Sequence, residues 1–122
     1  MNTEKIIIYT GLFGEYDNLT EPVFCHKNIQ YICFTNNNKL KSKYWKIINI
    51  NEYGSDRYLN RKVKMLPHLY LKNYKKSIYI DANVILFYNP FKLCSYLFTH
   101  SFVLFQHPNK QLFLRDTHHT LL

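Results

Sequence analysis

The 122-residue sequence has few residues that interrupt regular structure, with only 3 glycines and 4 prolines. This scarcity excludes a collagen-like, low-complexity or disordered chain. Acidic residues are also few, because 8 Asp and Glu stand against 16 Lys and Arg, for a formal net charge of +8. Such a surplus favours anionic partners, namely nucleic acid, a membrane surface or phosphorylated small molecules. Charge alone does not choose among these three classes.

Cysteine is sparse as well, and the three thiols, Cys25, Cys33 and Cys94, contain no Cys-x-x-Cys pair. Neither a disulfide framework nor a zinc knuckle is indicated, and a reducing compartment fits best. The apolar run near the start is too short for a signal-peptide core, and no run approaches the ~18 apolar residues of a membrane span. We therefore expect a cytoplasmic protein, with peripheral attachment to the inner face of the membrane left open.

Apolar and aromatic residues are plentiful, since 47% of the residues are hydrophobic and 17% aromatic. This content predicts one compact domain with a buried core. Short apolar runs that alternate with helical patterns predict an α/β fold with a mostly parallel sheet and flanking helices. We expect strands at 5–9, 30–35, 45–50, 77–80 and 101–105, and helices at 56–66 and 91–99.

Three cations recur at helical spacing in the expected helix 56–66. Arg57, Arg61 and Lys64 stand at i, i+4 and i+7, which places them on one face beside the apolar stripe. A helix that packs beside the strand at 77–80 would direct this face toward bound phosphates. The alternative is a solvated basic face without a ligand.

A polar triplet, Asp81-Ala82-Asn83, follows the expected strand 77–80 directly. In an extended segment residues i and i+2 project to the same side, so the two side-chain oxygens would face one hard cation. A divalent metal held there would bridge to a diphosphate and stabilise it as a leaving group. The alternative is a polar turn between two strands.

Several ordered segments resemble the GT-A-fold nucleotide-sugar glycosyltransferases. The runs RKVKMLPHL at 61–69 and SIYIDANV at 77–84 are similar to the core of that superfamily, whose metal motif Asp-x-Asp ends a strand. The segments IYTG at 8–11, GEYDN at 14–18, YICFTN at 31–36 and QHP at 106–108 look closer to one bacterial and plant branch of glycosyltransferase-like domains. Domains of that branch are often attached to products of polysaccharide or surface-glycan genes.

The resemblance implies a Rossmann-like nucleotide-binding half and assigns its donor site. Tyr9 and Thr10 would line the base pocket, and Asp17 would approach the nucleoside. Arg61 and Lys64 would meet the diphosphate or the donor sugar. These roles come from the resemblance and not from spacing.

The resemblance also implies a divalent metal, Mn²⁺ or Mg²⁺, held by Asp81 and Asn83. Asn83 departs from the second Asp of the superfamily, which lowers the negative charge of the site. No carboxylate pair for acid–base catalysis is assigned, so the catalytic residues and the stereochemical outcome stay open.

The length of the chain shapes the functional expectation. We expect a donor-binding domain over 1–108 that lacks an acceptor half, followed by a C-terminal tail over 109–122. The predicted function is binding of a nucleotide-diphosphate sugar, with hexosyl transfer to a glycan or lipid-linked acceptor if another chain or a homodimer completes the cleft. The alternatives are a catalytically inert nucleotide-sugar-binding module or gene remnant and, less favoured, a basic nucleic-acid-binding domain; no nucleic-acid partner is expected.

Overall fold

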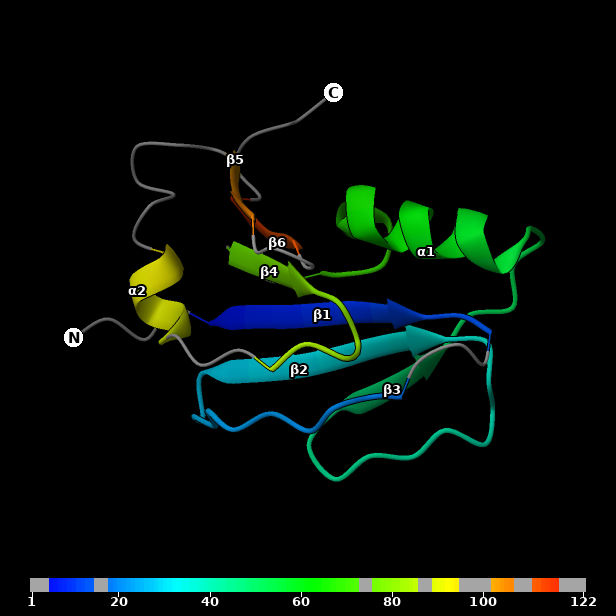
Figure 1. Cartoon of the computed structure of the whole chain (residues 1–122), viewed down its shortest axis with the longest axis horizontal. Coiled ribbons are helices and arrows are strands. Elements are labelled where there is room, and N and C mark those ends of the chain that lie inside the picture. Colours follow the sequence, from blue (N-terminus) through cyan, green and yellow to red (C-terminus); the bar gives the residue numbers. More distant parts are fainter. Residues whose placement is uncertain are drawn as a thin grey trace.

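The computed structural model describes residues 5–14, 18–72, 76–85 and 89–94, together with the backbone of two strands at 102–106 and 111–116. Figure 1 shows the arrangement of its helices and strands. In chain order they are β1 (Ile6–Leu12), β2 (Ile29–Thr35), β3 (Lys46–Asn49), α1 (Asp56–Met65), the 3₁₀ turn η1 (Pro67–Leu69), β4 (Lys76–Ile80), α2 (Pro90–Cys94), β5 (Phe102–Gln106) and β6 (Gln111–Asp116).

The strands form one sheet in the order β3-β2-β1-β4-β6-β5. The first four are parallel, in the Rossmann-like order 3-2-1-4, whereas β6 and β5 extend the sheet in antiparallel fashion. The predicted α/β class with a mostly parallel sheet is thus confirmed. Strand β6 lies within 109–122, the range that we expected to be a tail, and pairs with both β4 and β5.

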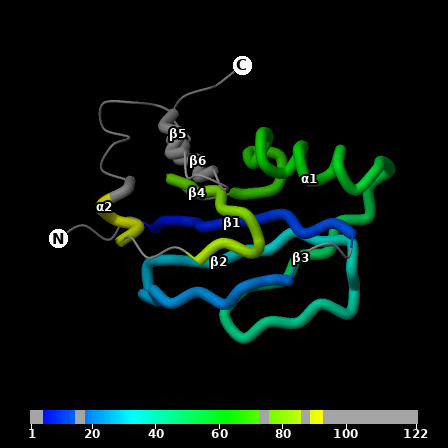
Figure 2. Tube along the Cα trace, viewed as in Figure 1, coloured from blue at the N-terminus to red at the C-terminus, as the bar shows by residue number. Residues whose placement is uncertain are grey.

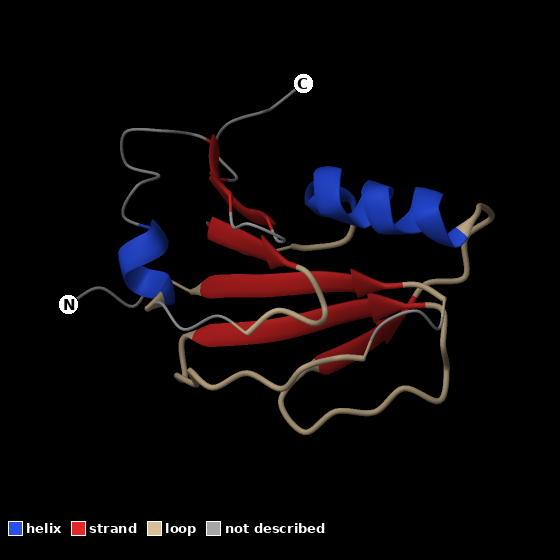
Figure 3. Ribbon diagram, viewed as in Figure 1, coloured by secondary structure: helices blue, strands red, loops and turns tan. Residues whose placement is uncertain are grey.

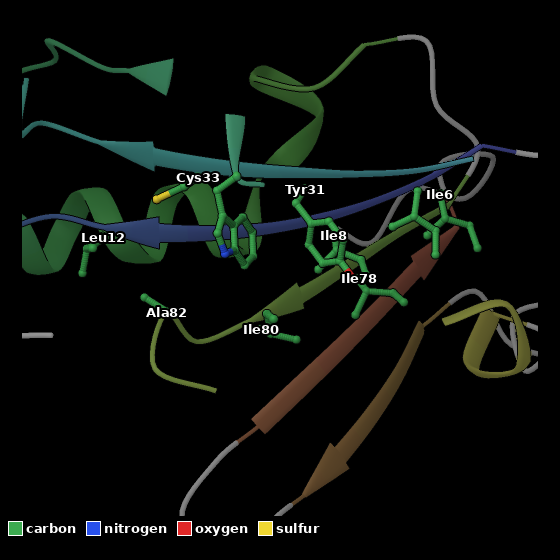
Figure 4. Packing of buried hydrophobic residues seen from close by; sticks show 10 residues of the cluster. Ile6, Ile8, Leu12, Tyr31, Cys33, Ile78, Ile80 and Ala82 are labelled. Carbon is green, nitrogen blue, oxygen red and sulfur yellow. The ribbon is translucent and has the colours of Figure 1, made fainter. Parts of the chain in front are cut away.

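Strands β1, β2 and β4 are buried along nearly their whole length because both faces of the sheet are covered. On one face Ile7 and Tyr9 pack in a cluster with Leu59 and Val63 of α1. On the other face lies a second cluster, which includes Ile6, Ile8, Tyr31, Trp45, Ile78 and Ile80 (Figure 4). Figure 3 shows that loops run along part of the sheet that α1 does not cover.

Helix α1 begins and ends close to where the sequence predicts. The Ser55 hydroxyl accepts a hydrogen bond from the Tyr58 amide at 3.1 Å, so Ser55 is the N-cap. At the other end the Leu66 amide donates to the Lys62 carbonyl at 2.9 Å, and Pro67 then starts η1. The predicted range 56–66 is confirmed to within one residue.

Thr20, in the loop after β1, is hydrogen-bonded both to a buried indole and to the chain directly after β4. Trp45 is 3% exposed, as expected for a core residue, and its Nε1 donates to the Thr20 carbonyl at 2.8 Å. The Thr20 amide in turn donates to the Ala82 carbonyl at 2.8 Å. These two hydrogen bonds fix the chain directly after β4, where the candidate site lies.

Several expectations fall partly or wholly outside the described residues. Of the expected helix 91–99, the structure shows α2 up to Cys94, and the remainder lies outside the described ranges. The expected strand 101–105 appears as β5, shifted by one residue. Asp17 also lies outside the described ranges.

Among the residues that the structure describes, no helix is long and apolar enough to cross a bilayer.

Candidate functional site

A cavity of about 380 Å³ lies at the carboxyl ends of β1 and β4, beside α1. This is the edge at which ligands bind in open α/β sheets. The end of β1 contributes Gly11, Leu12 and Phe13 to its wall. The other lining residues are Arg57, Asn60, Arg61 and Lys64 of α1, Tyr79 of β4, and the triplet Asp81, Ala82 and Asn83.

The three cations predicted to share one face of the helix all line this cavity. Arg57 and Arg61 are exposed, whereas Lys64 is half-buried. Among the described residues of the lining they face a single carboxylate, that of Asp81. The wall therefore carries a surplus of positive charge, which suits an anionic ligand.

Lys64 is held in place through its backbone and its side chain. The Tyr9 hydroxyl donates to the Lys64 carbonyl at 2.9 Å. The Lys64 ammonium lies 5.3 Å from the centroid of the Tyr79 ring, within the range of a cation–π contact. Burial lowers the pKa of Lys64, and the negative charge of Asp81 counteracts that shift.

Tyr79 and Asp81 also influence each other electrostatically. Burial raises the pKa of the Tyr79 hydroxyl, and the charge of Asp81 adds to the shift. Tyr79 is only 4% exposed and meets the Tyr9 ring edge to face, with centroids 5.3 Å apart. The phenol is therefore neutral at physiological pH, and Asp81 sits where it acts on both Tyr79 and Lys64.

The Asp81-Ala82-Asn83 segment is a turn and not the extended continuation of β4 that the i, i+2 argument assumes. The Val84 amide donates to the Asp81 carbonyl at 3.0 Å, which closes a four-residue turn. The Thr20 amide donates to the Ala82 carbonyl, within the same turn. Asp81 is half-buried and Asn83 exposed, and both still line the cavity.

The donor set of this turn decides how a divalent metal would fit. Asp81 offers one carboxylate and Asn83 one amide oxygen, both of which are suitable ligands for Mg²⁺ or Mn²⁺. Within the described residues, however, no group of three or more His, Cys, Asp or Glu side chains is placed to hold a metal ion. Asp81 and Asn83 would therefore supply at most two kinds of protein ligand, and a metal held there would complete its coordination with ligand phosphates and water.

Tyr9 and Thr10, to which the resemblance assigns the base pocket, are buried in β1. They are 1% and 0% exposed, and neither is among the lining residues of this cavity. Tyr9 supports the site through the hydrogen bond from its hydroxyl to the Lys64 carbonyl.

Gly11 and Asn60 are among the lining residues that the sequence did not single out, together with Leu12, Phe13 and Tyr79. A Cβ at Gly11 would come within 3.1 Å of the Asn60 Oδ1 atom and 3.4 Å of the Phe13 ring. Glycine thus allows α1 to approach the end of β1 closely. The dipeptide Thr10-Gly11 at the end of a strand was the available signal, but the partner on α1 depends on docking of the helix.

The comparisons with known proteins leave the family open. No protein-family model matches the sequence, and no curated protein and no solved structure matches it significantly. The structure itself establishes a small α/β domain with four parallel strands and a flanking helix. The functional argument therefore rests on the cavity.

Proposed function

We propose that the chain binds the diphosphate of a nucleotide-diphosphate sugar in the cavity at the carboxyl ends of β1 and β4. The observation that supports this proposal is the convergence of Arg57, Arg61 and Lys64 with Asp81 and Asn83 on one cavity. The resemblance to glycosyltransferases, which was drawn from sequence alone, assigns donor or metal roles to Arg61, Lys64, Asp81 and Asn83 but not to Arg57.

The size and chemistry of the cavity suit such a ligand. Its volume of about 380 Å³ lies within the range of about 300–1,000 Å³ that is typical of small-molecule sites. Arg57 and Arg61 present planar guanidinium groups that pair with phosphate oxygens through two parallel hydrogen bonds. Lys64 contributes a point charge deeper in the cavity, where burial strengthens its interaction with an anion.

In a transfer reaction these residues would stabilise the departing nucleoside diphosphate. Arg61 and Lys64 place fixed positive charge where negative charge develops as the glycosidic bond to the diphosphate breaks. Asp81 and Asn83 would hold Mn²⁺ or Mg²⁺, which when bound supplies further neutralisation of the diphosphate. The acceptor in this proposal is a glycan or a lipid-linked sugar.

A nucleotide-sugar-binding module without catalytic activity is the second candidate. It is favoured by the composition of the lining, which has one carboxylate, Asp81, among its described residues. A second carboxylate that would act as base or nucleophile is not placed beside it within those residues. This candidate predicts donor binding without turnover.

Replacing Asp81 by Asn is expected to remove the effect of metal on donor binding. We expect Mn²⁺ to tighten the binding of the best ligand among UDP, GDP, CDP and ADP to wild type by on the order of tenfold, or ~1.4 kcal/mol. Asp81→Asn keeps the shape of the side chain and the three cations, so binding without metal should persist. Calorimetric titration with and without Mn²⁺ measures both quantities.

The matched control is Glu52→Gln, which also removes one negative charge. Glu52 pairs with Lys62 at 2.7 Å and does not line the cavity. This variant should keep the wild-type response to Mn²⁺. A metal response that survives in Asp81→Asn would contradict the assignment of the metal site, and failure of all four nucleotides to bind wild type would contradict the proposed function.

A further inference from the structure

Two loops cover the sheet face opposite α1 and lie side by side, residues 18–28 and 36–45 (Figure 2). They are fastened together by Glu21. The Ser42 hydroxyl lies 2.8 Å from both carboxylate oxygens of Glu21, and the backbone amides of Lys43 and Tyr44 donate to the same carboxylate at 3.4 and 3.3 Å. We call the outer surface of these loops, continued by Lys46 at the start of β3, the two-loop face.

The second loop alternates between inward apolar and outward basic side chains. Leu40 and Trp45 pack against the core cluster of this sheet face. Lys39, Lys41 and Lys43 are exposed. One side of the loop therefore packs on the core, and the other side is a cationic surface.

The two-loop face has a strong excess of positive charge. Its five lysines are all exposed, and they stand against a single acidic residue, Glu21. The Glu21 carboxylate accepts hydrogen bonds from Ser42 and from backbone amides. Within the described part of the chain, no carboxylate forms a salt bridge with any of the five. These lysines are Lys27, Lys39, Lys41, Lys43 and Lys46.

The same two loops also carry an exposed apolar side chain and an exposed aromatic ring. Val23 is 60% exposed and stands two residues after Glu21, and Tyr44 is 46% exposed with the Lys43 ammonium 5.3 Å from its ring centroid. A groove of about 510 Å³ runs beside Tyr44 and is flanked by Lys27 and Lys46. This groove shares no lining residue with the cavity at the carboxyl ends of β1 and β4 that we propose to bind the nucleotide, hereafter the nucleotide cavity.

We propose that the two-loop face binds the surface of an anionic lipid bilayer. Clustered lysines interact with anionic headgroups as mobile point charges, each contributing about 1 kcal/mol near such a surface. Val23 and Tyr44 add an apolar side chain and an aromatic ring of the kind that settles at the headgroup level. This proposal is independent of nucleotide binding.

Single-stranded nucleic acid fits the face less well. Binding of that kind uses successive aromatic rings on which bases stack, together with a basic groove. Tyr44 is the one exposed Phe, Tyr or Trp of the two loops, since Phe24 is half-buried and Trp45 is buried. The exposed His26 already meets the Phe91 ring edge to face, with centroids 4.9 Å apart. The face also has no arginine, the residue that stacks on bases and binds phosphate bidentately.

The test is sedimentation of the full chain with vesicles at physiological ionic strength. Vesicles of phosphatidylcholine with one third phosphatidylglycerol should bind the chain, and pure phosphatidylcholine should not. The double variant Lys39→Gln/Lys41→Gln should lower the partition coefficient by about 30-fold, since two lysines contribute roughly 1 kcal/mol each. The double variant Lys62→Gln/Lys72→Gln removes the same charge elsewhere and should lower it by less than about threefold, the loss expected from long-range charge alone.

Three outcomes would overturn the proposal. The first is equal loss of binding in both double variants, which would mean that net charge and not the face is responsible. The second is binding to neutral and anionic vesicles alike. The third is tighter binding of a labelled oligothymidine than of anionic vesicles in the same buffer, lost in Lys39→Gln/Lys41→Gln, which would make nucleic acid the ligand of this face.

Discussion

Replacing Arg57 and Arg61 together by Gln is expected to weaken nucleoside diphosphate binding at least about 100-fold. Each hydrogen bond to a charged group contributes about 1.5–3 kcal/mol, so the loss of two guanidinium groups removes roughly 3 kcal/mol or more. Both side chains are exposed on α1, so the fold should be unaffected. Calorimetric titration of the variant with the nucleotide that binds wild type measures the loss.

The matched control for this prediction is Lys39→Gln/Lys41→Gln. This variant lowers the net charge by the same amount but changes residues that do not line the nucleotide cavity. It should bind the nucleotide within about threefold of wild type, because exposed charges beyond a Debye length are largely screened. Similar losses in the two double variants would show that overall charge, and not the cavity, attracts the nucleotide.

Replacing Leu59 by Ala is expected to lower the free energy of unfolding by about 2–5 kcal/mol. Leu59 is 2% exposed and packs with residues of β1 in the cluster that joins α1 to the sheet. This loss is a large part of the roughly 5–15 kcal/mol that stabilises a domain of this kind. Urea denaturation followed by circular dichroism measures it.

The matched control is Leu69→Ala, which removes the same atoms from a side chain that is 51% exposed. We expect this variant to lower the free energy of unfolding by less than about 1 kcal/mol, because folding removes less apolar surface from water at this position. Equal losses at the two positions would mean that α1 is not fixed to the sheet by Leu59. The cations that line the cavity would then lack the rigid support that the structure shows.

Much of the parallel part of the fold could be predicted from local sequence. Buried strands flanked by polar residues are apparent as apolar runs, and Ser55 before a helical pattern marks the start of α1. Strand β6 was missed because the apolar run in its sequence, QLFLRD, is only three residues long and is flanked by polar residues. Its pairing with β4 joins residues far apart in the chain, which local patterns do not reveal.

The candidate site was predicted in its residues more than in its geometry. The i, i+4, i+7 spacing of Arg57, Arg61 and Lys64 indicated one face, and the structure places that face in the cavity. The turn at Asp81 was considered only as the alternative to an extended segment. Its bond from the Val84 amide to the Asp81 carbonyl is local, whereas the bond from the Thr20 amide to the Ala82 carbonyl joins residues far apart in the chain. A long-range contact of the second kind leaves no pattern in the local sequence.

The two loops on the opposite sheet face show the same limit. The lysines at 39, 41 and 43 are evident in the sequence, but their common outward direction follows from the packing of Leu40 and Trp45. Glu21 offsets the charge of only one lysine, and its position between the two loops is not evident from the sequence. In the structure its carboxylate is held by Ser42 and two backbone amides.

The most direct test of the central claim is to map where a nucleoside diphosphate binds. Backbone amide shifts of the isotope-labelled chain would be followed by nuclear magnetic resonance during titration with the nucleotide. We predict saturable changes that are largest at residues 11–13, 57–64 and 81–83, which surround the nucleotide cavity. Changes confined to residues 25–31 and 44–46, beside the groove of the two-loop face, would contradict the account.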